Sequence, residues 1–294
     1  MHNKSLNTRI VKKYVYEVNA EGQDAPAKVL RAVGNGKRVL EIGCASGVQT
    51  RILKERQQCL VTGVEIDAEA ATSAAPFCDH LVVGDLESLD LDAALGDRRF
   101  DVITIADVLE HLRVPSRVLC RLSPFLDDGG YIVASIPNVV HAGLILDMAN
   151  GRFDYRPYGL LDDTHLRFFT LKSVHQLFAD CQLEIVDIDR VIRTVESSEF
   201  FHRPMSAGEA EVYRYVQAHN KECQTYQFIV KARPDLREGA ESAVARLDQA
   251  DREHRLELEN TELRKQVATL GSRLKWVESR PLYKILSRIR RTLS

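Results

Sequence analysis

The chain has 294 residues, of which 45% are apolar and 28% charged, and its formal net charge is −2. This balance argues against a polyanion-binding surface over the whole chain, so we expect no nucleic-acid partner. No run approaches about 18 apolar residues and the first residues lack a signal-peptide pattern, so we expect a cytoplasmic protein without a membrane span. The six scattered cysteines contain no CxxC pair, which excludes a zinc ribbon or a disulfide scaffold and suits a reducing compartment.

The near-neutral total conceals two unlike regions. Residues 1–235 carry 27 basic and 33 acidic side chains, whereas residues 236–294 carry 13 basic and 9 acidic ones. The last fifteen residues hold five basic side chains and no acidic one. The chain is therefore expected to combine an acidic body with a mildly basic C-terminal extension.

Short apolar runs alternate with helix-length segments in the first half of the chain. The expected strands are residues 38–42, 60–64, 81–83, 101–105 and 131–135, and the expected helices are 46–57, 68–75 and 116–126. Nearly continuous β-branched runs are typical of strands buried on both faces of a parallel sheet. The alternation predicts a doubly wound, Rossmann-like α/β fold, with a turn at residues 127–130 before the fifth strand.

The pattern changes after the fifth strand. Residues 137–170 are crowded with Gly, Pro, Asn and aromatic residues, which predicts an ordered insert on the substrate side rather than a core helix. A helix at 171–180 and closing strands at 182–192 and 225–231 follow. The body is thus expected to comprise an N-terminal helical cap (1–36) and a catalytic domain (37–235).

The C-terminal extension has a heptad pattern. Leu256, Leu263, Leu270 and Val277 recur every seven residues, which predicts a coiled coil over 236–279 and hence a homo-oligomer or hetero-pair. The alternative is one long amphipathic helix that packs on the body. Residues 280–294 predict a basic amphipathic tail, which either contacts the inner face of the cell membrane peripherally or simply solubilises the chain.

The most informative segment is residues 39–47, VLEIGCASG, where a strand ends, the chain turns and a helix begins. Its G-x-x-x-G spacing differs from the dinucleotide fingerprint, and Glu41 would repel phosphate but attract an amino group. Glu65 ends the second strand, where an acid can accept both ribose hydroxyls, and Asp85 follows the third, where a carboxylate can accept from an adenine amino group. A ribose, an adenine and an ammonium group without phosphate indicate S-adenosylmethionine (SAM).

These segments, together with FDVITIADVLEHL and DDGGYIVASIPN, resemble the class I SAM-dependent methyltransferases over about residues 30–232. The resemblance implies a seven-stranded sheet, SAM as cofactor and S-adenosylhomocysteine (SAH) as product. Ala45 stands where many members have a second glycine. The cofactor-binding residues implied are Glu41, Gly43, Cys44, Ala45, Gly47, Glu65, Ile66, Asp85, Leu86 and Ala106.

Two histidines are candidate catalytic bases, because methyl transfer to a hydroxyl requires removal of its proton. His111 lies beyond the fourth strand, and His165 lies in the insert. If residues 107–111 form a helical turn, Asp107, Glu110 and His111 share one face. With His165 these side chains form a candidate divalent-metal site, and a similar pattern occurs in some ubiquinone-pathway and small-RNA O-methyltransferases. The alternative is that Asp107 caps the helix while Glu110 and His111 hold the insert by hydrogen bonds.

The acceptor is the hardest feature to predict. Residues 135–138 and the segment GRFDYRPYGLLDDTHLRFFT resemble bacterial methyltransferases of surface-polysaccharide assembly. In this segment, aromatic side chains could stack on sugar faces and arginines could bind acidic groups. The alternative is that the aromatic rings pack the insert onto the sheet. The residues are Phe153, Tyr155, Tyr158, Phe168, Arg152, Arg156 and Arg167. We expect O-methylation of a saccharide hydroxyl. The alternatives are a phenol or quinone precursor, less readily RNA, or a non-catalytic SAM-binding partner module.

Overall fold

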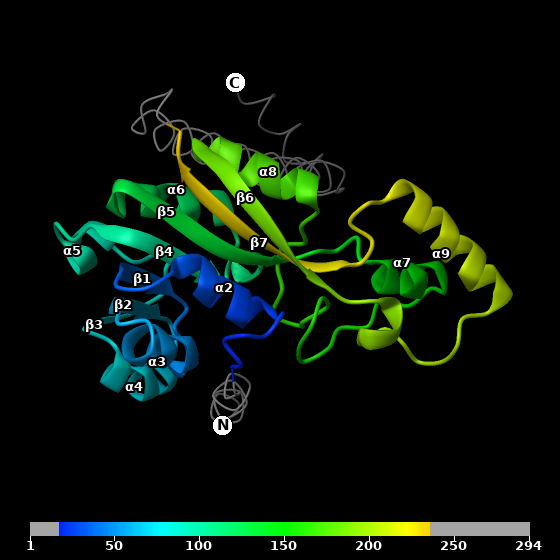
Figure 1. The fold of residues 1–294 in the computed structure, drawn as a ribbon, viewed down its shortest axis with the longest axis horizontal. Coiled ribbons are helices and arrows are strands. Elements are labelled where there is room, and N and C mark those ends of the chain that lie inside the picture. Colours follow the sequence, from blue (N-terminus) through cyan, green and yellow to red (C-terminus); the bar gives the residue numbers. More distant parts are fainter. Residues whose placement is uncertain (1–17, 236–294) are drawn as a thin grey trace, which may run out of the picture. The chain divides into compact units, whose positions relative to one another are not determined.

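The computed structural model describes residues 18–235, which form a seven-stranded sheet in the order β3-β2-β1-β4-β5-β7-β6 (Figure 1). The strands are β1 (Arg38–Ile42), β2 (Leu60–Glu65), β3 (His80–Val83), β4 (Phe100–Ala106), β5 (Leu126–Pro137), β6 (Leu183–Ile192) and β7 (Thr225–Pro234). Strands β1 to β5 are parallel, and β7 is inserted antiparallel between β5 and β6. The predicted Rossmann-like fold is confirmed.

Helices cover both faces of the sheet. The helices are α2 (Ala25–Val33), α3 (Val48–Glu55), α4 (Ala68–Ala74), α5 (Leu91–Leu95), α6 (Pro115–Leu122), α7 (Ala142–Ala149), α8 (Leu171–Asp180) and α9 (Ala207–His219). Helices α2, α3 and α4 pack on one face, α6 and α8 pack on the other, and α7 and α9 contact each other beyond the end of the sheet (Figure 1).

The central strands form the core because helices exclude water from both of their faces. Val39 and Leu40 of β1 and Ile103 of β4 are completely buried, as the near-continuous apolar runs predict. Since these strands are parallel, their carboxyl ends meet at one edge of the sheet, where open α/β folds bind ligands. Ile42, Glu65 and Ala106 end their strands at this edge.

Two local predictions in the body are wrong. The expected turn at 127–130 lies inside β5, which already pairs at Leu126 with Phe100; the irregular register and the left-handed Gly129 (φ 73°) mark a bulge there. The insert does contain a buried helix, α7, whose first turn is capped by His141. Its buried Leu144 and Leu146 pack against other elements, so tertiary burial outweighs the turn-rich composition around it.

The cysteines also depart from expectation, because Cys120 of α6 and Cys181 after α8 form a disulfide. Their Cα atoms lie 4.9 Å apart although 61 residues separate them in the chain. Helices α6 and α8 are neighbours on one face of the sheet, and spacing along a sequence does not reveal such a pairing.

Several predicted segments lie outside the described residues. These are the first part of the N-terminal cap (1–17), the coiled coil (236–279) and the basic tail (280–294). Within the described part, the cap contributes α2, which packs on β4, β5 and β7. No helix between residues 18 and 235 is long and apolar enough to cross a membrane.

Candidate active site

The glycine loop connects β1 to α3, and the Glu65 carboxylate at the end of β2 holds it in place. The backbone N–H of Ala45 donates to Glu65 Oε2 at 2.8 Å, and the N–H of Asp67 donates to Glu65 Oε1 at 2.9 Å. Each carboxylate oxygen keeps a further lone pair with which it could accept a ribose hydroxyl. The structure therefore joins two of the predicted cofactor residues.

Backbone geometry explains the composition of this loop. Ala45 has φ 47°, a left-handed conformation that costs an alanine about 1–2 kcal/mol and a glycine almost nothing. Gly43 and Gly47 are also left-handed, at φ 72° and 82°. At Gly43 a side chain would in addition meet Val108, because a Cβ atom there would lie 2.7 Å from a Val108 methyl group. The spacing of small residues thus follows from the shape of the turn.

The Glu41 side chain is buried at the end of β1. The Thr50 hydroxyl, in the first turns of α3, donates to Glu41 Oε2 at 2.6 Å. Burial raises the pKa of Glu41 to about 8, although the bond from Thr50 opposes this shift. A cation placed beside Glu41 would favour its charged form. Sequence reasoning missed Thr50, which carries no motif signal of its own.

The remaining predicted cofactor residues also lie at the carboxyl edge, and their roles stay predictions. Asp85 is exposed after β3, and its Oδ1 accepts the N–H of Glu87 at 2.9 Å. Leu86 and Cys44 are buried, Ala106 is half-buried, and Ile66 is 66% exposed at the end of β2. Ile66 therefore offers an uncovered apolar surface close to Glu65.

Asp107 does not join the cluster expected for it. Its backbone is left-handed (φ 53°), and the short 3-10 helix η2 (Leu109–His111) starts only after Val108, so Asp107 neither caps that helix nor shares a face with Glu110 and His111. Its Oδ1 instead accepts the Ser135 hydroxyl at 3.0 Å and the Gln227 amide at 2.6 Å. Desolvation of the carboxylate by the surrounding protein raises the pKa of Asp107 to about 6, and these two bonds oppose the shift.

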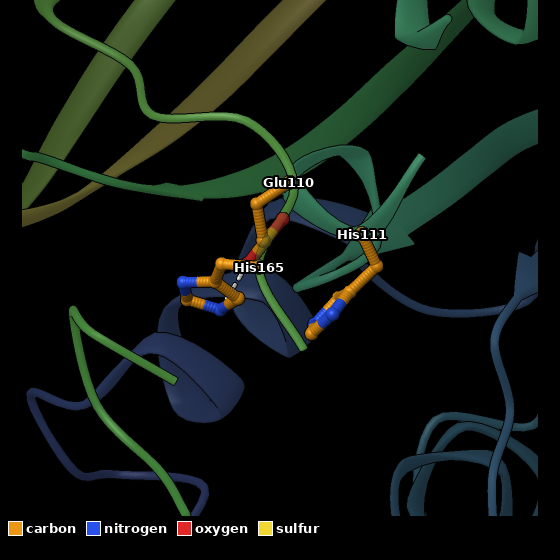
Figure 2. A group of neighbouring side chains, drawn as sticks. All are labelled: Glu110, His111 and His165. Carbon is orange, nitrogen blue, oxygen red and sulfur yellow. Dashed lines mark ion pairs between the residues drawn. The ribbon is translucent and has the colours of Figure 1, made fainter. Parts of the chain in front are cut away.

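Glu110, His111 and His165 do come together (Figure 2). The Nε2 atom of His165 lies 3.9 Å from Glu110 Oε1, and the two imidazole rings meet edge to face with centroids 4.8 Å apart. Glu110 is 1% exposed, and neither of its carboxylate oxygens has a hydrogen-bond partner. Burial therefore raises the pKa of Glu110 well above its ordinary value.

Backbone hydrogen bonds attach the insert to η2 at this cluster. The carbonyl of Glu110 accepts the N–H groups of Leu166 and Arg167 at 2.8 and 2.9 Å. The His111 Nδ1 atom lies 3.1 Å from the Thr164 hydroxyl. The predicted tie between residues 110–111 and the insert is thus present, and it brings His165 to the carboxyl end of β4.

The same three side chains could hold a divalent metal. One ligand atom from each of Glu110, His111 and His165 lies within 4.8 Å of the others, and the unsatisfied Glu110 carboxylate suits a cation. Two imidazoles and a carboxylate match ions such as Zn²⁺ or Mn²⁺. Such an ion would supply a Lewis acid for an acceptor hydroxyl. Asp107 is not among these candidate ligands.

The insert presents aromatic rings to solvent and uses its arginines internally. The exposed fractions of Phe153, Tyr155, Tyr158 and Phe168 are 42%, 58%, 67% and 37%. The guanidinium groups of Arg152, Arg156 and Arg167 donate to Asp147, to the carbonyl of Glu199 and to the carbonyl of Arg113. The rings are therefore the more available surface for an acceptor.

The sheet, the glycine loop and the acids at the ends of β1 and β2 define a class I SAM-dependent methyltransferase. The chain belongs to the family described as "methyltransferase domain", whose model matches residues 14–188, more than half of the chain. Among solved structures, the magnesium protoporphyrin IX methyltransferase (ChlM) from Synechocystis PCC 6803 with bound SAH is similar, with a TM-score of 0.51. It is 15% identical and the match covers 79% of this chain and 95% of that one, which shows a shared fold.

Curated relatives match about half of the chain. A protein named ubiquinone biosynthesis O-methyltransferase in Stutzerimonas stutzeri is 25% identical over 194 residues, which cover 55% of this chain and 80% of that protein. A protein of the same name in Coxiella burnetii is 29% identical over 176 residues, covering 49% and 73%. The chain is thus a SAM-dependent methyltransferase, and both of these relatives are named as O-methyltransferases.

Proposed function

We propose that this enzyme transfers the methyl group of SAM to a hydroxyl of a phenol or quinone precursor, and that His165 accepts the hydroxyl proton. The observation that carries the proposal is the buried pair of Glu110 and His165 at the carboxyl end of β4. The relatives named ubiquinone biosynthesis O-methyltransferase support this acceptor over the saccharide that the insert suggests in sequence.

The reaction forms one O–CH₃ bond as the S–CH₃ bond of the sulfonium breaks, and it produces SAH. Because the sulfonium is already activated, the enzyme's main tasks are to align the acceptor oxygen with the methyl group and to remove its proton. The glycine loop and Glu65 would fix the cofactor at the ends of β1 and β2. The insert would deliver the acceptor from the side of β4.

The protonation state of the Glu110 carboxyl group affects whether His165 can act as a base. Burial raises the pKa of Glu110 well above the ordinary value, which favours the protonated, neutral form of the carboxyl group. A neutral carboxyl withholds the negative charge that would favour an imidazolium. The His165 ring can then receive a proton at the moment of methyl transfer, while the bond of its Nδ1 with the Leu160 carbonyl, at 3.2 Å, orients the ring.

The rings around His165 suit a flat, aromatic acceptor. The centroid of Phe168 lies 6.4 Å from that of His165, and Phe153 meets Phe168 at 6.1 Å. Both phenylalanines are substantially exposed, so part of each ring is accessible to a ligand. Aromatic pairs in such arrangements contribute about 0.5–1.5 kcal/mol beyond burial of their area.

The decisive experiment offers two classes of acceptor to the same enzyme. Labelled methyl transfer from SAM would be measured with a catechol or polyhydroxylated benzoate series and with fractionated polysaccharide. Product in the phenol series with none in the glycan fractions is expected. Label that enters only the glycan would replace the phenol by a saccharide hydroxyl, and label in neither series, despite tight SAM binding, would count against both acceptors.

A further inference from the structure

Two cysteines meet beneath the glycine loop without forming a disulfide. Cys44 belongs to the loop and Cys78 precedes β3, and both lie over Gly63 of β2. A Cβ atom at Gly63 would lie 2.9 Å from each sulfur, so the missing side chain is what leaves them room. The Cys44 thiol donates a hydrogen bond to the Cys78 sulfur.

The two thiols are chemically unequal. The bond from Cys44 and the positive charge of Lys54 lower the pKa of Cys78 despite its partial burial. Donation of that bond, together with burial, raises the pKa of Cys44 far above its ordinary range. Cys78 is half-buried, whereas Cys44 is 4% exposed. The more accessible cysteine is therefore also the one with more thiolate, which is the form that reacts with oxidants.

We propose that Cys78 and Cys44 form a thiol-modification site for hydrogen peroxide, and that their oxidation to a disulfide weakens SAM binding. In the first step the Cys78 thiolate attacks one peroxide oxygen, the O–O bond breaks, and a sulfenic acid and hydroxide result. In the second step the Cys44 thiol attacks the sulfenic sulfur, the S–O bond breaks, and one water leaves. Two thiols and one peroxide thus yield one disulfide and two waters.

The effect on the cofactor follows from the position of Cys44. Its backbone N–H donates to the Val64 carbonyl at 3.3 Å, and the adjacent Ala45 N–H donates to Glu65. A disulfide holds its sulfurs at about 2.05 Å, closer than a hydrogen-bonded pair of thiols. Forming it pulls Cys44 toward Cys78, and the glycine loop, which is predicted to bind SAM, moves with it. The expected loss of affinity concerns SAM binding and is independent of the identity of the acceptor.

The test treats the full chain with stoichiometric hydrogen peroxide and maps thiols by alkylation and peptide mass. Cys44, Cys59, Cys78 and Cys223 are the four free cysteines, so two alkylated thiols should disappear and the peptides of Cys44 and Cys78 should become linked. The SAM dissociation constant, measured by calorimetry, should rise at least about tenfold and return to its starting value with dithiothreitol.

Matched variants make the result specific. Cys78→Ser should bind SAM normally and keep its affinity after peroxide, although it retains the Cys120–Cys181 disulfide. Cys59→Ser should respond as the unmodified protein does, because Cys59 is buried at a different place, beside the Gly34 carbonyl. Peroxide that over-oxidises Cys78 without a link to Cys44 would overturn the proposal. So would a Cys44–Cys78 link that leaves SAM affinity unchanged.

Discussion

The Nε2 atom of His165 lies 3.9 Å from Glu110 Oε1, and neither Glu110 oxygen has a hydrogen-bond partner. The two side chains come from separate elements, η2 and the insert, which backbone hydrogen bonds fasten together at this point. A buried carboxyl left unsatisfied costs about 1–3 kcal/mol or more. An unsatisfied carboxyl group at the carboxyl edge of the sheet is expected in a binding site, where the bound methyl acceptor, and not another protein group, completes its hydrogen bonds.

Replacement of His165 by Ala should lower kcat by about 10²- to 10⁴-fold, the range typical of a lost general base. The dissociation constant of SAM should stay the same, because the glycine loop and Glu65 lie at the ends of β1 and β2, whereas His165 belongs to the insert. Glu110→Gln should retain most of the activity, since an amide imitates a carboxyl that holds its proton. Single-turnover rates and SAM calorimetry measure these effects.

The matched control for His165 is His175→Ala, which changes an exposed histidine of α8. It should leave kcat within about twofold of the parent. If His165→Ala retained full turnover with the true acceptor, proton removal by this side chain would be excluded. A large loss of activity in Glu110→Gln would instead indicate that a charged carboxylate is needed.

Removal of divalent metal tests the other chemistry available to this cluster. If proton transfer to His165 suffices, enzyme treated with a chelator and freed of the chelator should keep at least about half of its turnover. Added Zn²⁺ or Mn²⁺ should not raise the rate of this enzyme. Loss of turnover that either metal restores, together with loss of metal binding in His111→Ala, would assign the site to metal catalysis.

Much of the fold could be predicted because its strands are buried on both faces. Such strands, for example 38–42, appear as uninterrupted apolar runs, and for β1 to β4 structure and prediction agree within a residue or two. Strand β5 begins five residues before its predicted start. Helices α7 and α9 were not predicted, although neither contains a proline. The capping box of Ser206 and Glu209 at the start of α9 was an available signal that sequence reasoning did not use.

The cofactor side of the site was more predictable than the acceptor side for a physical reason. Glu41 and Glu65 end parallel strands, so their position in sequence fixes their position in space. Asp107 has a left-handed backbone just before η2, and no helical spacing rule anticipates that. The Cys120–Cys181 disulfide likewise depends on which helices are neighbours, which linear spacing does not contain.

Glu41 should make the stability of the enzyme depend on pH. Its pKa in the folded protein, about 8, lies above its ordinary value of 4.5, so the folded state binds more protons than the unfolded state between these values. The free energy of unfolding should therefore fall as pH rises from about 4.5 to 8 because of this group. Glu41→Gln should remove this pH dependence, which is on the order of a few kcal/mol. The gain in stability of the variant over the parent should therefore be largest at pH 8.

The same substitution should lower the affinity for SAM by about tenfold or more at pH 8. The reason is that a neutral amide does not attract the ammonium group of the cofactor as a carboxylate does. Denaturant titrations from pH 5 to pH 9 and SAM calorimetry would measure both effects. Glu55→Gln, at an exposed position of α3, is the control and should change neither. Equal stability of Glu41→Gln and the parent at every pH would show that the buried carboxyl is not destabilising.

Phe153 and Phe168 should govern acceptor affinity without affecting the cofactor. Their centroids lie 6.1 Å apart and Phe168 adjoins His165, so an aromatic acceptor at His165 would lie against them. Phe168→Ala should raise the acceptor KM by about 3- to 10-fold, the loss of one aromatic contact, and leave the SAM dissociation constant unchanged. Phe153→Leu keeps apolar area but loses the ring. Its rise in acceptor KM should be smaller than that of Phe168→Ala, and this difference would separate stacking from simple burial.

Tyr215→Ala is the control for surface aromatic residues, because Tyr215 is 65% exposed on α9 and stacks only on His219 among the ring contacts of residues 18–235. It should leave the acceptor KM unchanged. A saccharide acceptor would also pack on aromatic rings, through its C–H groups, so the comparison is made with pairs of acceptors that differ only in aromaticity. Stacking requires a π-face on both partners, so only the catechol of a matched catechol and cyclohexane diol pair can stack on Phe168. If Phe168→Ala lowered the affinity for both compounds equally, Phe168 would supply apolar area and not aromatic recognition.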